Sequence, residues 1–522
     1  MKIEHADIVV IGASLGGVLA AASASRAGAR VRLVAEHAWL GGQMTAQAVP
    51  PDEHPLIESG GASASYRRFR EDIRTRVRAQ PGFLDRATMT RGTNPGDGWV
   101  SRLCFEPAHA VDWFEELLSH PVTAGHLQVV RGAWPVAATR LGRRITDVVI
   151  ESAAGQTRLT AALFIDATDT GELLRLADLP YRLGKEAAAE FDEPDAPAQA
   201  NRLDQQPVTH VMALRWHARP GPLISAPPAS AFWRRQGVPQ QADLLFSNSL
   251  PGRERGSSSS LPFCGSGDTL DWWRYRRIVS GAQWADGRAD VSLVNWAQND
   301  YALQPLLDGP RPQPEVEAAA RALSLCLLHW LQTEAPRPDG RNGGRGFPEW
   351  QLATDMLGTA DGLAQQTYVR ESRRIVARTT LSQRQLLEGS ATARADSAGV
   401  GWYNLDIHPT CVSGHSVNHR VAPFVLPLGA FIPLDCDNLL PACKNLGVTH
   451  LASACTRVHP VEWLAGEVAG LLAAHALAAG RAPAACLDSP AGLAAVQVAL
   501  AAAGIPLAWP VAMLARAGNR AH

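Results

Sequence analysis

The sequence lacks the features that mark metalloproteins and nucleic-acid-binding proteins. Its eight cysteines are scattered, with no C-x-x-C pair and no Cys/His spacing suited to a metal or an iron–sulfur cluster. The formal net charge is −1, so no basic field attracts nucleic acid. We therefore expect reduced thiols, no metal site and no nucleic-acid partner.

Lysine is also scarce. It occurs only at Lys2, Lys185 and Lys444, while arginine supplies the other 46 basic residues. Together with the abundant alanine, this is typical of compositional bias and indicates no function.

Long, strongly hydrophobic runs are missing as well. The uncharged stretch 490–515 is mostly alanine and is interrupted by Gly504, Pro506 and Pro510, which favours a packed C-terminal helix over a membrane span. Near the N-terminus, acidic residues stand where a signal peptide would have basic ones. We expect a cytoplasmic protein without membrane association.

The length of 522 residues favours two to four structural units. Regular α/β patterning covers 1–185 and returns over 361–480, and a helical tail follows over 481–522. The intervening segment, 186–360, is rich in proline and loops and holds eight of the fifteen tryptophans. We predict a discontinuous nucleotide-binding domain interrupted by a substrate domain, with most of these tryptophans in its core rather than on pocket walls.

The N-terminal pattern predicts a βαβ unit, with strand 8–11, a helix over about 16–27 and strand 31–34. In the turn, Gly12 and Gly17 occupy the first and last glycine positions of a G-x-G-x-x-G motif, and Ser14 replaces the middle glycine. The first glycine permits the tight turn and the last permits close helix–strand packing. Serine adds only a hydroxymethyl group, whose hydroxyl can hydrogen-bond a phosphate at the helix N-terminus. The serine at position 14 therefore alters the phosphate-binding turn but does not abolish it.

An acidic residue follows the second strand. Glu36 lies 24 residues after Gly12, close to the position at which an acid accepts hydrogen bonds from the adenosine ribose. These features together predict a dinucleotide site.

A second motif indicates that the dinucleotide site binds FAD rather than NAD. "LFIDATDTGELL", residues 163–174, is an apolar strand ending in A-T-x-T-G. It resembles the second FAD-contacting strand and turn of glutathione-reductase-type flavoproteins. An NAD-dependent dehydrogenase would leave this motif unexplained.

Further blocks extend the resemblance over about residues 8–479. In this order they resemble the motif series of the FAD-dependent oxidoreductase family, in its xanthan-lyase-like group, in which a G-x-[ST]-x-x-G loop is common. The resemblance implies an α/β fold: a glutathione-reductase-like, Rossmann-type FAD-binding domain with an inserted α+β substrate domain and a C-terminal helical tail. The blocks are "VIGASLGGVLAA", "GGQMTAQ", "LCFEPAHAVDWFEELL", "LFIDATDTGELLRLADLPYRLGKE", "VNWAQNDY", "YVRESRRIVARTTL", "YNLDIHP" and "NLLPACKNLGVTHLASACTRVHP".

The resemblance implies FAD as the cofactor, with the last helix directing its N-terminus at the N1–C2=O edge of the flavin. Related succinate and fumarate oxidoreductases carry a flavin-tethering histidine near the second glycine loop, where this chain has Gln43 and Met44. We therefore predict non-covalent FAD. The residues expected to bind it are Gly12, Ser14, Leu15, Gly16, Gly17, Glu36, His37, Gly41, Gly42, Gln43, Met44, Ala167, Thr168, Gly171, Asn445, Pro460 and Glu462.

Candidate catalytic residues gather in two late stretches, 406–420 and 449–460. Arg457 and His459 directly precede the flavin-facing helix, and we expect them to anchor the substrate and transfer a proton, with His415 or His408 on the opposing wall. For each residue taken singly, a solvent-exposed or supporting role stays open.

Two arginine-rich stretches are given structural roles. The group at 370–374 has the spacing of a structural ion-pair network rather than a substrate clamp. Arg67, Arg68 and Arg70 are expected on a solvated helix face.

The sequence thus predicts a dehydrogenase or oxidase that transfers hydride between flavin N5 and a small polar, possibly cyclic, substrate. A flavin monooxygenase of secondary metabolism is an alternative, but "PACKNLG", residues 441–447, lacks the aspartate of the hydroxylase G-D motif. A non-redox FAD-binding protein is a second alternative.

No second nucleotide fold is visible, since "GRNGGRG" at 340–346 has no strand before it. The electron partner (oxygen, a quinone or NAD(P)H) and the oligomeric state stay open.

Overall fold

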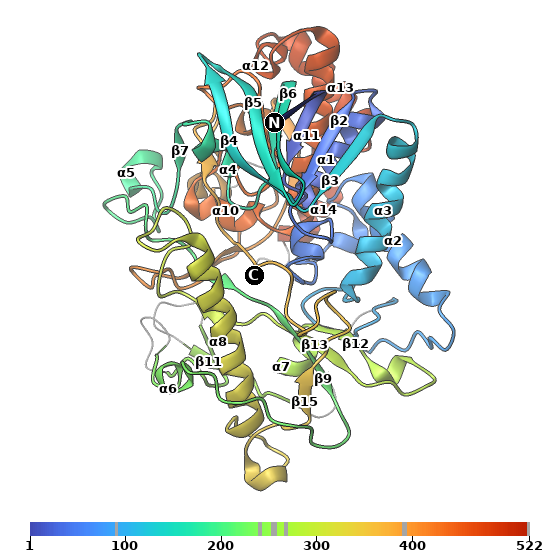
Figure 1. Cartoon of the computed structure of the whole chain (residues 1–522), viewed down its shortest axis with the longest axis vertical. Coiled ribbons are helices and arrows are strands. Elements are labelled where there is room, and N and C mark those ends of the chain that lie inside the picture. The colour runs from blue at the N-terminus through green and yellow to red at the C-terminus, as the bar shows by residue number, and fades with distance from the viewer. Residues whose placement is uncertain (89–91, 238–242, 252–257, 266–269, 389–393, 519–522) are drawn as a thin grey trace.

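The chain contains a mixed sheet covered by helices and a second group of strands with a long helix. The computed structural model describes residues 1–88, 92–237, 243–251, 258–265, 270–388 and 394–518. The sheet and its covering helices form the upper part of Figure 1, and the second group lies below them.

The main sheet has the strand order β3-β2-β1-β6-β5-β4, and β21 also pairs with β6. The pairs β3–β2, β2–β1, β1–β6 and β6–β21 are parallel, whereas β4, β5 and β6 form an antiparallel meander. The strand β21 joins the sheet from late in the chain, as a Rossmann-type FAD fold requires. The strands span β1 (Lys2–Ile11), β2 (Val31–Ala35), β3 (Leu127–Arg131), β4 (Ala133–Leu141), β5 (Arg144–Ser152), β6 (Gly155–Asp166) and β21 (Leu439–Pro441).

The first βαβ unit forms where the sequence predicts it. The apolar end of β1 is fully buried, because parallel strands covered on both faces read as continuous hydrophobic runs. Gly12 then turns the chain with φ at 95°, a conformation that favours glycine. The helix α1 (Leu15–Arg26) follows, and β2 returns in register, with Val31 opposite Ile8.

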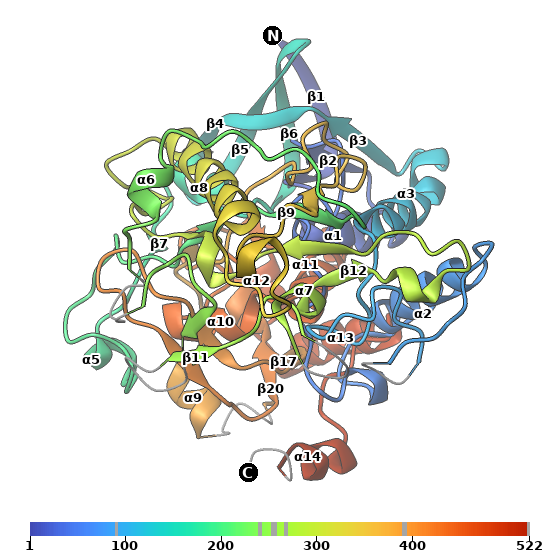
Figure 2. The same ribbon diagram turned by 90° about the horizontal axis from the view of Figure 1, so that it is seen from below.

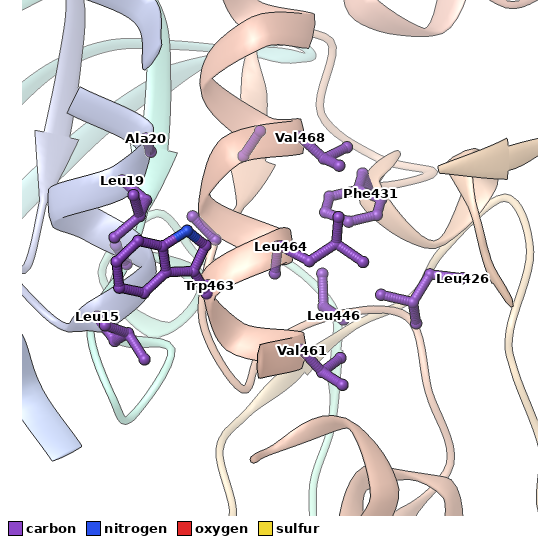
Figure 3. Packing of buried hydrophobic residues seen from close by; sticks show 14 of the residues in the cluster. Leu15, Leu19, Ala20, Leu426, Phe431, Leu446, Val461, Trp463, Leu464 and Val468 are labelled. Carbon is purple, nitrogen blue, oxygen red and sulfur yellow. The ribbon is translucent and has the colours of Figure 1, made fainter. Parts of the chain in front are cut away.

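The long helix α11 (His459–Ala479) covers α1. A Cβ on Gly466 would come within 2.2 Å of the Gly16 carbonyl oxygen, and one on Gly470 within 2.4 Å of the Ala20 oxygen, so both glycines are needed for this close approach. In Figure 3, Trp463 points toward α1 while Leu464 and Val468 point to the opposite side. This helix is long and apolar enough to cross a membrane, but 78% of its apolar window is buried here, as in a core helix.

The helix α3 (Pro107–Thr123) packs against α1 and β3, and α2 (Ala64–Arg78) packs against α3. Arg67 and Arg68 are exposed on α2, as expected. The expectation for Arg70 was wrong, because its side chain is buried and pairs with Glu53 and Glu58. A buried guanidinium is tolerated since two carboxylates surround it.

The second group of elements has its own aromatic core. An antiparallel sheet in the order β12-β13-β9-β15 packs with the long helix α8 (Gln313–Thr333), drawn in yellow in Figures 1 and 2. Seven of the eight tryptophans of this segment are buried, Trp216 being partly exposed, so the predicted core role is confirmed for most of them. The strands are β9 (Met212–Trp216), β12 (Arg277–Val279), β13 (Val291–Val294) and β15 (Trp350–Leu352).

The remaining elements are short. Uncharged residues 490–515 form α13 and the first part of α14 rather than one span. "GRNGGRG" holds only a short 3-10 turn, so the loop prediction is confirmed.

The remaining helices are α4 (Glu172–Leu176), α5 (Ala188–Phe191), α6 (Ser230–Trp233), α7 (Trp272–Tyr275), α9 (Gln383–Leu387), α10 (His450–Thr456), α12 (Pro483–Cys486), α13 (Pro490–Ala502) and α14 (Val511–Gly518). The paired strands are β7 (Tyr181–Arg182) with β16 (Arg374–Ile375), β8 (Val208–Thr209) with β14 (Asp300–Tyr301), β10 (Ser249–Pro251) with β11 (Ser258–Ser260), β17 (Ser397–Gly401) with β20 (Phe424–Pro427), and β18 (Leu405–Ile407) with β19 (Val417–His419).

The arginines at 370–374 are buried in ion pairs, as predicted. Arg374 contacts Glu371 and Glu186, and Arg373 contacts Asp308 and Glu172. These pairs tie β16 to segments from both parts of the chain.

Candidate active site

A cavity of about 220 Å³ opens where β1, β2 and β6 end. In α/β sheets this carboxyl edge is where ligands bind. The cavity wall includes Gly12, Ala13, Ser14, Val34, Glu36, His37, Trp39, Gly42, Ala46, Ala133, Trp134, Pro135, Ala167, Thr168, Asp169, Thr170, Glu172, Gln313 and Gln366.

The glycine turn forms a cradle with no room for side chains. A Cβ on Gly12 would lie 2.4 Å from the Ala167 carbonyl oxygen, and one on Gly42 would lie 2.8 Å from the Ser14 Cα. The Ser14 hydroxyl caps α1 by accepting a hydrogen bond from the Gly17 N–H at 3.2 Å. The helix N-terminus, with its positive dipole end, suits a pyrophosphate. The serine therefore preserves the site.

The far end of the cavity fits an adenosine. Glu36 follows β2 and exposes 61% of its side chain, and a carboxylate there can accept from ribose hydroxyls. Trp134 on β4 is 42% exposed and offers a stacking surface on the same wall. The sequence reasoning missed Trp134, whose only signal was its position just after the third parallel strand.

A buried charge cluster supports the cradle from behind. The Lys444 ammonium, 1% exposed, donates to Asp169 at 2.5 Å and lies 3.1 Å from Glu462. Glu462 also accepts hydrogen bonds from the Gly16 N–H and the Gln43 amide. Burial alone would lower the pKa of Lys444, but the two carboxylates outweigh it and raise that pKa.

Not every predicted cofactor residue lies on the cavity wall. Gly12, Ser14, Glu36, His37, Gly42, Ala167 and Thr168 do. Others lie behind it: Asn445, for example, donates to the Asp166 carbonyl oxygen, and Gly171 precedes α4 in the left-handed conformation. Those outside the wall are Leu15, Gly16, Gly17, Gly41, Gln43, Met44, Gly171, Asn445, Pro460 and Glu462. Lys444 and Asp169 were missed, although a single lysine inside an apolar stretch was a usable signal.

A second cavity, of about 440 Å³, borders the N-terminal end of α11 through Arg457. Its size and mixed lining suit a small organic molecule. Polar groups from distant parts of the chain line it: Asp52, Ser259, Ser260, Tyr275, Arg276, Asn295, Tyr368, Arg370, Tyr403, Asn404, Asp406, His408, Ser416, Asn418 and Arg457.

His408 on this wall has the surroundings of a proton-transfer group. Its Nδ1 lies 2.5 Å from the buried Asp300 carboxylate, and its Nε2 lies 3.5 Å from Asp406. Burial and the nearby Arg370 would lower its pKa, but Asp300 and Asp406 outweigh them and raise the pKa above its usual value.

Arg457 lies in the same cavity and is held from two sides. Its Nη1 donates to the Tyr368 hydroxyl at 2.7 Å, and its Nη2 donates to the Asp406 carbonyl oxygen at 3.1 Å. The structure thus brings Arg457 and His408 together on one cavity, as the sequence predicted.

The other two predicted histidines lie elsewhere. His459 is fully buried: its Nδ1 accepts from the Asp52 N–H, and its Nε2 lies 3.1 Å from the Val49 carbonyl oxygen. Burial lowers its pKa to about 4, so the ring is neutral and joins the start of α11 to the segment 49–52. His415 lines a third cavity, with Lys185 and Asp204, rather than the second.

The sheet, the pyrophosphate cradle and a second, polar cavity define an FAD-binding oxidoreductase of the Rossmann type. The chain belongs to the FAD dependent oxidoreductase family, whose model matches residues 7–500. It is therefore an enzyme with FAD as its cofactor. The match covers the family as a whole, so the xanthan-lyase-like grouping stays a prediction.

No curated protein matches the sequence. Among solved structures, the myxobacterial chondrochloren halogenase CndH is 13% identical, with 93% of this chain and 78% of that chain covered and a TM-score of 0.35. The geranylgeranyl bacteriochlorophyll reductase-like protein Ta0516 from Thermoplasma acidophilum is 10% identical, with 95% and 83% covered and a TM-score of 0.34. L-proline dehydrogenase from P. horikoshii is 14% identical, with a TM-score of 0.19. There, 32% of this chain is covered, and the chain spans only 23% of that protein. At these values the similarities carry no argument about the reaction.

Proposed function

We propose that the protein is a dehydrogenase or oxidase acting on a small polar organic substrate bound in the second cavity. Bound FAD supplies the hydride acceptor or donor, at its N5 atom. Since Gln43 and Met44 stand where related enzymes carry a tethering histidine, the cofactor is held without a covalent bond.

The observation that supports this proposal most directly is the pairing of His408, on the cavity wall, with the buried carboxylate of Asp300. Asp300 accepts the Nδ1–H hydrogen bond, which directs the other ring nitrogen, Nε2, toward the cavity side where Asp406 lies. In the oxidation of an alcohol or amine, Nε2 accepts the proton of the substrate hydroxyl or ammonium group. In the reverse direction, the imidazolium returns it. The buried Asp300 stabilises that cation.

Other residues of the cavity bind and orient the substrate. Arg457 is held in place by Tyr368 and Asp406, so it can position a substrate oxygen without losing its own orientation. Tyr275 and Trp296, whose ring centroids are 4.9 Å apart, give the same cavity an aromatic wall that excludes water from one side of the substrate.

The proposal is tested by the visible spectrum of the purified protein, followed by anaerobic addition of candidate reductants. We expect flavin bands near ~370 and ~450 nm, release of the flavin on heat denaturation, and bleaching by an alcohol or amine metabolite. A flavin that only NADPH reduces, with oxygen then incorporated into product, would contradict the proposal in favour of a monooxygenase. A flavin that no metabolite or nicotinamide reduces would favour a structural role.

A further inference from the structure

We propose that the substrate of the second cavity carries a carboxylate, which the guanidinium of Arg276 binds. This inference rests on the proposed function, because it names the chemical class of the molecule that this cavity holds. The evidence is the hydrogen bonding of the arginine side chains: Arg276 has buried N–H groups without acceptors, whereas the other arginines nearby are hydrogen-bonded or ion-paired.

Arg276 lines the cavity and makes no side-chain hydrogen bond to any residue that the structure describes. Its Nε and Nη1 atoms are buried without a hydrogen-bond partner there, and the side chain as a whole is 14% exposed. The nearest carboxylate, Asp52, lies 4.0 Å from Nη1, too far for a hydrogen bond. Asp52 and the Tyr275 ring, whose centroid lies 5.5 Å from the guanidinium carbon, compensate the charge of Arg276 only in part. Buried N–H donors without acceptors are unfavourable, so this arrangement indicates a further anionic partner.

The next residue, Arg277, is an arginine whose donors are used by structural hydrogen bonds and an ion pair. Arg277 donates to the carbonyl oxygens of Gly96 and Asp97 and pairs with Asp290 at 2.8 Å. Arg277 is the first residue of β12 and holds that strand against the loop at 96–97. Arg276 directly follows the short helix α7 as its C-cap residue and lines the cavity.

The other two cavity arginines are engaged. Arg370 pairs with Asp300 at 2.9 Å and donates to the Pro207 carbonyl oxygen. Arg457 has only its Nε without a partner among the described residues. Arg276 is thus the cavity cation with the most unused donors.

The chemistry around Arg276 favours a carboxylate. A guanidinium presents a planar pair of N–H groups that matches the two oxygens of a carboxylate. Tyr275 and Tyr403 line the same cavity, and burial raises the pKa of both phenols, so they stay neutral and can donate O–H hydrogen bonds. A carboxylate bound there would lie in the same cavity as His408, which acts on another part of the same molecule.

The test uses the flavin-loaded protein and pairs of molecules that differ only in charge. Benzoate and benzamide are titrated separately, as are acetate and acetamide, and binding is followed by the change in the visible flavin spectrum and by calorimetry. Sodium sulfate and phosphate serve as tetrahedral anions. We expect saturable binding of the carboxylates, at least about tenfold tighter than that of the amides and of the tetrahedral anions.

Two variants assign the effect to one side chain. Arg276→Gln should weaken benzoate binding by at least about tenfold, while benzamide binding should not change. Arg276→Lys keeps the charge without the planar fork, so it should show a smaller loss, and it carries the test if the glutamine variant does not fold. The matched control is Arg288→Gln, a partly exposed arginine that pairs with Asp286 outside the cavity.

The outcomes separate this inference from the proposed function. Equal affinity for benzoate and benzamide, or unchanged benzoate binding in both Arg276 variants, would overturn the inference in a protein whose flavin is still reduced by substrate. A protein that binds benzoate through Arg276 by calorimetry but has a flavin that no metabolite reduces would support the inference and overturn the proposed function.

Discussion

Removing the buried ammonium of Lys444 should destabilise the protein strongly. Lys444 is 1% exposed, and its two partners, Asp169 and Glu462, are 5% and 0% exposed at their side chains. Lys444→Met keeps most of the side-chain volume but leaves two buried carboxylates without their cation. Breaking one partner of a buried ion pair lowers the free energy of unfolding by about 3–5 kcal/mol.

The assay is urea unfolding of the FAD-loaded protein, followed by far-ultraviolet circular dichroism. Lys2→Met is the matched control, since Lys2 is 73% exposed and should contribute less than about 1 kcal/mol through its pair with Glu4. Adding Glu462→Gln to Lys444→Met should restore part of the loss, because it removes one of the two unpaired charges.

The pH dependence gives a second measurement. Burial raises the pKa of Glu462 already in the native protein. A carboxyl whose pKa is higher in the folded than in the unfolded state destabilises the fold as pH rises through the folded pKa. The loss in free energy of unfolding caused by Lys444→Met should therefore become smaller as pH falls and Glu462 takes up a proton. A loss below about 1 kcal/mol, or one that does not shrink at low pH, would refute the reasoning.

Four further predictions concern the two cavities. His408→Gln should lower kcat by about 10²- to 10⁴-fold without loss of FAD, while His419→Gln, an exposed histidine, should not; equal activity would remove His408 from the mechanism. In the wild type, substrate oxidation needs His408 neutral, so kcat/KM should rise with pH through a pKa above 6.5, and a flat profile would contradict this. Ser14→Ala should lower stability by about 1 kcal/mol but retain FAD, as measured by unfolding and flavin content; a flavin-free variant would show that the hydroxyl is essential. Glu36→Ala should weaken FAD about tenfold or more in equilibrium dialysis, and unchanged affinity would place the ribose elsewhere.

The predicted FAD-binding residues that lie on the wall of the first cavity have local determinants. Gly12, Ser14 and Glu36 lie within one βαβ unit, where turn geometry, helix capping and strand length fix their positions relative to one another. The same holds for Ala167 and Thr168, which directly follow an apolar strand. The family model confirms the FAD assignment that these residues supported.

The substrate half was predicted only in part, because it depends on long-range contacts. His408 and His415 lie in one short stretch, and only the distant Asp300, 108 residues before His408, distinguishes them. His459 had the expected position in sequence, but two backbone groups bind its ring. Nothing in the sequence marked Arg276, because adjacent arginines look alike until the structure shows that one caps the end of α7 and the other begins β12.

The close packing of α11 on α1 also affects the order of events during synthesis. Glu462 and its hydrogen-bond partner Gly16 are separated by 446 residues. At a translation rate of ~5–20 residues per second, the N-terminal βαβ unit waits roughly 20–90 s for the helix that covers it. During that time the apolar face of α1 is uncovered on the ribosome. The pyrophosphate cradle is therefore made well before the helix that supports it, and we expect stable FAD binding only after α11 has been added.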